Sequence, residues 1–296
     1  MVTARKPRPR KVLTRRRNFL GWAGYGTLGS VLSACGYSRL VEPWWIDYSY
    51  TRIAVRRLPA AFDGLRIAHL SDLHANPVSP EEIEGWIDKA NHLGADLIAL
   101  TGDFVTGPSR SNVTEIARRL RQLKAPLGVV ACLGNHDYGS PYPNSREDHR
   151  SFGRFTRNAL EHAGVEVLVN GFTERRREGD TLTLAGCGDL WTADFDMDFL
   201  SEAPRGPLVV LAHNPDTLYS LHYHNFDLML AGHTHGCHVQ FPFLGPPRLP
   251  IRHRHMAGGH YTYEHTQVYV SRGLGYLSSL KFRSRPELGI IELHRA

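Results

Sequence analysis

The sequence has few cysteines and no long hydrophobic run. It contains four cysteines in 296 residues, and after Cys35 only three remain, which permit at most one disulfide and exclude a disulfide-stapled scaffold. The apolar part of its longest uncharged run is interrupted by glycines and falls short of the roughly 18 consecutive apolar residues expected of a membrane-spanning helix. With 42% hydrophobic and 22% charged residues, the chain is typical of a globular protein with a substantial core.

Acidic residues are absent from the first 35 positions, which hold eight of the 35 lysines and arginines. The rest of the chain has 27 basic and 29 acidic residues, so the net charge of +6 belongs to this leader. Binding to a phosphate backbone depends on a clustered excess of basic side chains. We therefore expect no specific nucleic-acid partner.

The leader (residues 1–35) combines a basic stretch, the pair Arg16-Arg17 and an uncharged run over 19–34. This order resembles a bacterial twin-arginine export signal. The run ends with Leu-Ser-Ala at 32–34 followed by Cys35, which resembles a lipobox and predicts a lipid anchor on Cys35. Ordinary cleavage after residue 34 and an uncleaved anchor are the alternatives. The expected location is the bacterial cell envelope, in the periplasm or on the outer face of the cytoplasmic membrane.

Residues 36–60 are predicted to form a linker that leads into an edge strand, and residues 61–296 the folded domain. From residue 65 onward, strand-like apolar runs alternate with helical periodicity, which indicates βαβ units and a largely parallel sheet in the first half. One helix is expected from the capping box that begins at Ser79, and a second from the apolar repeat between Val113 and Leu123. The second half has more strands and fewer helices. The predicted strands are 65–70, 96–100, 127–133, 165–169, 182–185, 208–211, 228–230, 268–270 and 290–293.

Polar residues of the kind that bind metals follow five of these strands. The carboxyl ends of strands are where open α/β sheets bind ligands, and glycines at 102, 134 and 232 allow tight turns directly before the donors. A single histidine in such a place is more often a hydrogen-bonded structural residue, but five clusters in one chain favour a metal site. The clusters contain Asp72, His74, Asp103, Asn135, His136, Asp137, His213, His233 and His235.

In this order the clusters match the motifs D-x-H, G-D, G-N-H-D/E, H and G-H-x-H, and the chain thereby resembles the calcineurin-like metallophosphoesterase superfamily. Flanking blocks such as Ser271-Arg272-Gly273 extend the resemblance over residues 50 to 295 and are similar to its exported or membrane-associated bacterial branch. The resemblance implies an α/β fold, a layered α-β-β-α sandwich of two mixed sheets flanked by helices, in a single metallophosphoesterase domain.

The resemblance also implies two divalent metal ions. Imidazole, carboxylate and amide ligands suit Mn, Fe or Zn, and the sequence does not choose among them. One ion would be bound by Asp72, His74 and His235, the other by Asn135, His213 and His233, with Asp103 bridging both.

The activity implied is that of a binuclear metal-dependent phosphoesterase, which hydrolyses a phosphodiester or phosphomonoester by attack of a hydroxide shared by the metals. His136 follows a ligand and is not itself assigned to a metal, so it is the candidate general acid, and Asp137 is expected to orient its imidazole. An envelope location suggests lipid head groups, wall polymers or nucleotides as substrates.

Two residues near these motifs, Arg272 and Cys237, have open interpretations. Arg272 is a candidate for binding substrate phosphate, and a structural ion pair is the alternative. Cys237-His238 replaces the usual Gly-Gln of the family directly after the last donors. Cys237 is interpreted as a silent neighbour of the ligands, with an adventitious soft ligand or an oxidation site as alternatives.

Two other functions compete with the hydrolase hypothesis. The first is a non-catalytic metal-binding envelope lipoprotein on the same fold, which the complete donor set with His136 and Asp137 argues against. The second is an exported nuclease, which the near-neutral charge after the leader argues against.

Overall fold

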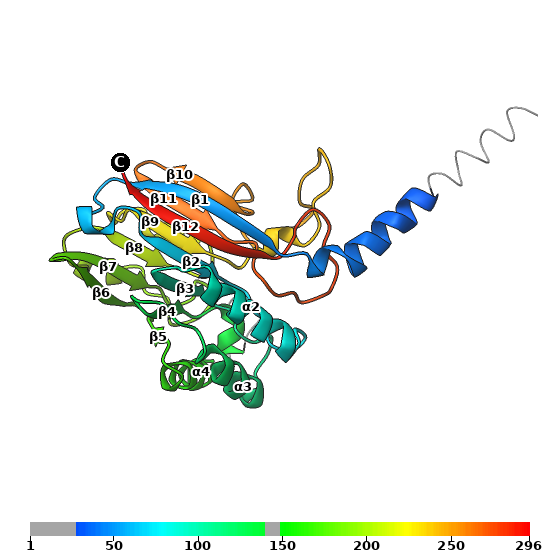
Figure 1. The fold of residues 1–296 in the computed structure, drawn as a ribbon, viewed down its shortest axis with the longest axis horizontal. Coiled ribbons are helices and arrows are strands. Elements are labelled where there is room, and N and C mark those ends of the chain that lie inside the picture. The colour runs from blue at the N-terminus through cyan, green and yellow to red at the C-terminus, as the bar shows by residue number, and fades with distance from the viewer. Residues whose placement is uncertain (1–27, 140–148) are drawn as a thin grey trace, which may run out of the picture.

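Two six-stranded mixed sheets lie face to face in the computed structural model, which describes residues 28–139 and 149–296 (Figure 1). Most strand pairs in both sheets are parallel; one internal pair of the first sheet and both edge pairs of the second are antiparallel. The first sheet has the order β1 (Asp47–Val55), β12 (Glu287–Arg295), β2 (Arg66–Leu70), β3 (Leu97–Thr101), β4 (Val129–Cys132) and β5 (Glu166–Val167). The second has the order β10 (Gly259–Tyr263), β11 (Thr266–Val270), β9 (Leu228–Ala231), β8 (Leu208–Leu211), β7 (Asp180–Gly186) and β6 (Gly171–Arg177).

The central strands are continuous apolar runs because both of their faces are buried. Side chains such as Ile67 and Val130 of the first sheet and Val209 and Leu228 of the second belong to one cluster between the sheets. The opposite face of the first sheet contributes to a second cluster with the helices, and that of the second sheet to a third. The strands are thereby fixed in place up to their carboxyl ends.

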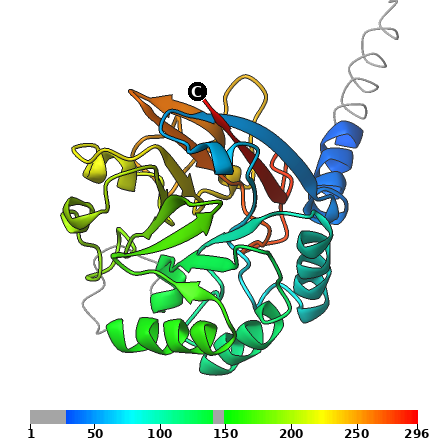
Figure 2. The same cartoon turned by 60° about the vertical axis from the view of Figure 1, so that its left-hand side comes forward.

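Helices cover the outer face of the first sheet: α2 (Pro80–His92), α3 (Arg110–Leu120) and α4 (Arg150–His162) (Figure 2). The capping box of α2 is confirmed, since the Ser79 hydroxyl accepts from the Glu82 amide at 3.2 Å and Glu82 accepts from the Ser79 amide at 3.0 Å. Within the described ranges, the second sheet is covered only by the short helices η4 (Phe199–Glu202) and α5 (Thr217–Leu221), together with the segment 249–256. The predicted sandwich of two mixed sheets is confirmed.

The chain enters the first sheet through a helix that covers 28–40 and projects from the sheets (Figure 1). Residues 36–40, expected to be linker, continue this helix, and β1 then pairs with β12 at the sheet edge. Among the residues described, no helix combines the length and the hydrophobicity needed to cross a bilayer. The predicted export pair Arg16-Arg17 lies outside the described residues.

Candidate metal centre

The loops after five strands meet at one edge of the sandwich. Asp72 and His74 follow β2, Asp103 follows β3, and Asn135 to Asp137 form the short helix η3 (Asn135–Tyr138) after β4. His213 follows β8 of the second sheet, and His233 and His235 follow β9. All nine of these sequence-predicted residues are buried. The parallel strands thus bring together residues that lie up to 163 positions apart in the chain.

Two glycines allow these loops to approach one another. A Cβ atom on Gly134 would lie 2.3 Å from Oδ1 of Asp103, and one on Gly232 would lie 2.5 Å from Oδ2 of Asp72. Neither position has room for a side chain without displacing a carboxylate of the site. The glycines noted in the sequence are therefore required by close approach.

The backbone itself is unusual at the site. Five of the polar residues adopt positive φ angles between 47° and 68°, a region that costs a residue with a side chain about 1–2 kcal/mol. Such conformations persist only where the surrounding structure enforces them, and they concentrate at functional sites. The five residues are Asp72, His74, Asp103, His233 and His235.

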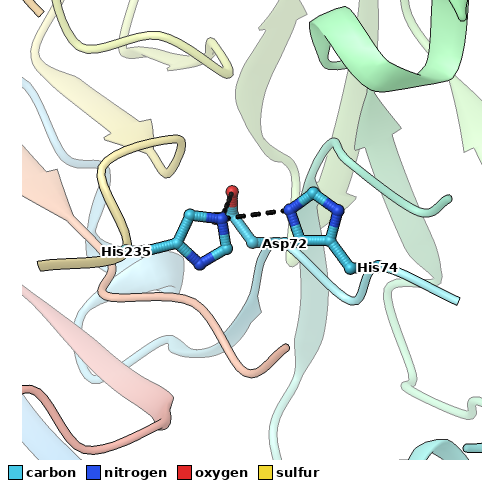
Figure 3. A group of neighbouring side chains, drawn as sticks. All are labelled: Asp72, His74 and His235. Carbon is cyan, nitrogen blue, oxygen red and sulfur yellow. Dashed lines mark hydrogen bonds and ion pairs between the residues drawn. The ribbon is translucent and has the colours of Figure 1, made fainter. Parts of the chain in front are cut away.

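Asp72, His74 and His235 form the first group of potential metal ligands (Figure 3). The Nε2 atoms of His74 and His235 are 3.0 Å apart, and Nε2 of His235 lies 3.5 Å from Oδ1 of Asp72. Two imidazole nitrogens that bind one ion at about 2.0–2.1 Å are themselves about 3 Å apart. The spacing of the first group fits one ion.

Asp103, His213 and His233 form the second group. Nδ1 of His233 lies 3.0 Å from Nε2 of His213, which lies 3.3 Å from Oδ2 of Asp103. The same Oδ2 atom is 3.5 Å from Nε2 of His74 in the first group. One carboxylate oxygen therefore faces both groups, as a bridging ligand does.

The outer nitrogens of these imidazoles are engaged by the protein. Nδ1 of His213 lies 2.7 Å from the Thr101 carbonyl, and Nε2 of His233 lies 3.2 Å from the Pro250 carbonyl. A carbonyl accepts a proton, so in the neutral rings the inward nitrogens carry the lone pairs. The tautomers are those that metal ligation needs.

The electrostatics also suit cations. Burial lowers the pKa of His74 and His233 to about 3 and that of His235 well below its usual range, so these rings are neutral at pH 7 and can bind a metal. Burial alone would lower the pKa of His213, but the Asp103 carboxylate raises it well above its usual value. A positive charge is thus favoured beside Asp103, and the donor set fits divalent ions.

His136 lines the cavity over both groups, beside the ring of His74 at a centroid distance of 5.0 Å. Its Nδ1 atom lies 2.6 Å from the carbonyl oxygen of Thr106, which leaves Nε2 available for proton transfer. Its backbone amide donates to Oδ1 of Asp103 at 3.0 Å. His136 is therefore fixed relative to the carboxylate that the two groups share.

The expectation that Asp137 orients His136 is wrong. Both carboxylate oxygens of Asp137 accept backbone N–H groups instead, at 2.8 Å from Asp103, 2.8 Å from Phe104, 3.4 Å from Val105 and 2.9 Å from Gly134. Asp137 therefore joins the loops after β3 and β4. The imidazole of His136 is oriented instead by the carbonyl of Thr106.

Arg272 is engaged in a structural ion-pair network. Its guanidinium donates to Glu287 at 2.8 Å and to Asp47 at 2.6 Å, and it is absent from the lining of the cavity over the metal groups. The structural alternative thus describes its geometry, and the contact with substrate phosphate stays a prediction.

Cys237 donates its thiol to the Arg248 carbonyl and is half-buried. It belongs to neither metal-ligand group found among the described residues. Its neighbour His238 stacks on His235 with ring centroids 4.6 Å apart. This geometry agrees with Cys237 as a neighbour of the ligands, and it places an aromatic ring against one of them.

Three residues near the metal groups were not indicated by the sequence. The Thr106 hydroxyl lies 3.2 Å from Nδ1 of His74, the Trp191 ring meets His233 edge-on at 4.5 Å, and Asp189 is a buried carboxyl whose pKa burial raises to about 6. Asp189 follows the strand β7, so its position resembled that of the other donors. Thr106 and Trp191 belong to no pattern.

The metal groups lie at the floor of a cavity of about 1000 Å³. Its lining includes Asn135, His136, Trp191, Arg248 and His253. Basic and aromatic side chains thus surround the space above two cation sites, which suits an anionic ligand.

Comparisons with known proteins agree with this geometry. The calcineurin-like phosphoesterase family matches residues 65–237. The chain is 33% identical to phosphodiesterase YaeI of Escherichia coli, over 88% of this chain and 93% of that protein. It is 30% identical to the uncharacterized metallophosphoesterase YkuE of Bacillus subtilis, over 96% of this chain and 98% of that protein. It is 28% identical to the UDP-2,3-diacylglucosamine pyrophosphatase LpxG of Chlamydia trachomatis, over 77% of this chain and 83% of that protein. The chain therefore belongs to the calcineurin-like phosphoesterase family and is a metal-dependent phosphohydrolase.

Proposed function

We propose that this phosphohydrolase is binuclear, that it hydrolyses a phosphodiester or phosphomonoester, and that it acts in the cell envelope. The observation that carries the proposal is the position of Asp103, whose Oδ2 atom faces His74 at 3.5 Å and His213 at 3.3 Å. A carboxylate shared by two ligand groups is the arrangement that offsets the repulsion between two neighbouring cations.

The residues that would hold the ions are the two groups already described, with Asn135 as an additional oxygen ligand on the side of His213. Two divalent cations bound there would lower the pKa of a shared water and offset the charge of the phosphoryl oxygens. The rest of the reaction depends on side chains of the chain itself.

His136 would supply the proton for the leaving alkoxide. Its Nδ1–H is donated to the Thr106 carbonyl, so the proton delivered to the leaving oxygen comes from Nε2 of the charged ring. The carboxylate of Asp103 accepts from the His136 backbone amide and so couples the position of the acid to that of the metals.

The test uses full-length protein that is stripped of metal and reloaded with Mn²⁺. We expect hydrolysis of an aryl phosphodiester or monoester that depends on the added ion, and loss of activity in Asp103→Ala. The names of two relatives, a phosphodiesterase and a pyrophosphatase, favour diesters and pyrophosphates as the first natural compounds to test, drawn from lipid head groups, wall polymers and nucleotides. Two bound ions without turnover on this panel would refute the hydrolytic assignment.

The envelope location is tested separately. Cys35 is exposed, so it is accessible to acylation. Replacing Arg16 and Arg17 by lysine should retain the precursor in the cytoplasm, whereas Cys35→Ser should leave export intact and prevent incorporation of labelled fatty acid. Normal export of the lysine variant would exclude the twin-arginine route.

A further inference from the structure

Three segments that are distant in the sequence form one continuous surface beside the cavity. The Lys281 amide donates to the Ser38 carbonyl at 2.9 Å, which joins the loop over 274–286 to the helix over 28–40. The Phe282 amide donates to His238 at 2.7 Å, and the Gln240 amide donates to Phe282 at 2.8 Å, which joins the same loop to the segment 237–247. Figure 1 shows these segments at the end of the sandwich from which the helix leaves.

This surface carries large apolar side chains that nothing in the described structure covers. Phe243 is 106% exposed and Leu244 84% exposed, at the tip of a loop closed by hydrogen bonds between Phe241 and Gly245. Exposed apolar residues on a monomer are normally scattered singly, whereas these lie on joined segments. We call them the apolar rim, which consists of Phe241, Phe243, Leu244, Leu277 and Leu280, together with Trp44, whose ring meets that of Tyr276 in the loop over 274–286.

Exposed arginines flank these segments. Residues 233–286 contain seven lysines and arginines and one acidic residue, Glu264; of the seven, Lys281 is buried and Arg272 and Arg285 are ion-paired. Within the described ranges, no carboxylate forms an ion pair with the exposed Arg248, Arg254 or Arg283. Acidic Glu42 is buried, where it accepts from the Ser284 amide. Around the apolar rim the surface is therefore positive.

The amino-terminal part of the chain leads away from this surface. The sequence has no charged residue from 18 to 38, and Cys35 lies three residues before Ser38, whose carbonyl is bonded to Lys281. Either a lipid on Cys35 or an uncleaved apolar leader would place this end of the protein next to a membrane. A convex apolar tip ringed by arginine suits the boundary between headgroups and acyl chains better than it suits a second flat protein surface.

We propose that the apolar rim docks the protein on an anionic lipid bilayer, with Phe243 and Leu244 entering the acyl boundary and Arg248, Arg254 and Arg283 at the headgroups. Leu277 and Arg248 also line the cavity over the metal groups, so the cavity opens beside the docked surface. Docking in this position would bring headgroup phosphoesters to the metal groups. That consequence rests on the proposed function, whereas the docking itself does not.

The test measures sedimentation with vesicles in the absence of substrate. All chains are full length and carry Cys35→Ser, so that acylation does not contribute and the leader is the same in each. The double variant Phe243→Asp/Leu244→Asp removes the tip, and aspartate tolerates the left-handed backbone of Phe243 (φ 66°) at least as well as phenylalanine. Tyr223→Asp is the matched control, since Tyr223 is 83% exposed and lies outside the joined segments.

On vesicles of phosphatidylcholine and phosphatidylglycerol, we expect the double variant to bind at least about tenfold more weakly, with the control unchanged. Arg283→Gln should weaken binding to these vesicles and not to pure phosphatidylcholine. Arg176→Gln, at an exposed position of β6, should have no effect. Unchanged circular dichroism and unchanged turnover of a soluble aryl phosphoester separate loss of docking from loss of fold or activity.

A second measurement places the tip directly. Phe243→Trp should add fluorescence that vesicles with brominated acyl chains quench, and Tyr223→Trp should add fluorescence that they do not. Equal vesicle binding by wild type and the double variant, or an unquenched tryptophan at 243, would overturn the proposal.

Discussion

The carbonyl oxygen of Thr106 lies 2.6 Å from Nδ1 of His136, and this bond assigns the two nitrogens of the imidazole different tasks. Nδ1 is committed to the backbone, so only Nε2 can exchange a proton with a ligand in the cavity. The fixed ring then donates along one direction, which is what a general acid requires.

His136→Ala should therefore impair hydrolysis according to the leaving group. For an alkyl phosphoester, whose alkoxide needs a proton, we expect kcat to fall by about 10²–10⁴-fold. For a nitrophenyl ester, whose phenolate leaves unprotonated, the loss should be less than about tenfold. The measurement is kcat for a series of esters of graded leaving-group pKa, with His92→Ala, an exposed histidine of α2, as the control. Equal losses across the series would contradict the assignment.

Asp103→Ala should remove both metal ions, because the shared Oδ2 atom faces both groups. His235→Ala should leave one ion bound at the group of His213, since His235 belongs only to the first group. Metal content by mass spectrometry after dialysis tests both statements, with circular dichroism to confirm folding. Retention of two ions in Asp103→Ala would show that this carboxylate does not bridge them.

Asp137→Asn should destabilise the fold more than it alters the chemistry. The amide nitrogen of asparagine would face N–H groups that the carboxylate now accepts, from Asp103, Phe104, Val105 and Gly134. We expect the free energy of unfolding to fall by about 3 kcal/mol, measured by denaturant titration of the metal-free protein. Asp88→Asn, at a position 76% exposed, serves as control. Unchanged stability with reduced kcat would restore a direct role of Asp137 on His136.

Gly232→Ala should weaken metal binding through Asp72. The added Cβ would lie 1.9 Å from the Ser71 hydroxyl and 2.5 Å from the Asp72 carboxylate, so one of them must move. We expect a loss of stability of about 1–3 kcal/mol and weaker Mn²⁺ affinity by calorimetry. Gly85→Ala, in α2 with open space around it, should instead stabilise the protein by up to about 1 kcal/mol. Normal affinity in Gly232→Ala would show that the loop adapts.

Local patterns in the sequence predicted much of the fold. The capping box at Ser79 gave the start of α2, and continuous apolar runs predicted the buried central strands, because both signals act within a few residues. The strand predicted over 165–169 is observed only as β5 (Glu166–Val167), and the helix predicted to reach Leu123 ends at Leu120. Element boundaries depend on tertiary contacts that no local pattern contains.

The donors of the metal groups were predictable because a family pattern and strand ends coincide at them. The contacts of Asp137, Thr106 and Arg272 were not predictable, because each contact depends on how separate loops meet. Asp137 accepts N–H groups from the loop after β3, 32 to 34 residues away in sequence, and Arg272 meets Asp47 across 225 residues. Because His136 and Asp137 are adjacent in sequence, a contact between their side chains was expected. In the short helix η3 the two side chains contact different partners.

The backbone is left-handed at Asp72, His74, Asp103, His233 and His235. The proposed metal centre and the stability of the fold therefore favour different residues at these positions. At such angles glycine lacks the steric cost of about 1–2 kcal/mol that a side chain brings, so the residues proposed to hold metal are also those whose replacement by glycine would relieve backbone strain. A descendant of this protein released from selection for hydrolysis would gain robustness by drifting to glycine at these sites.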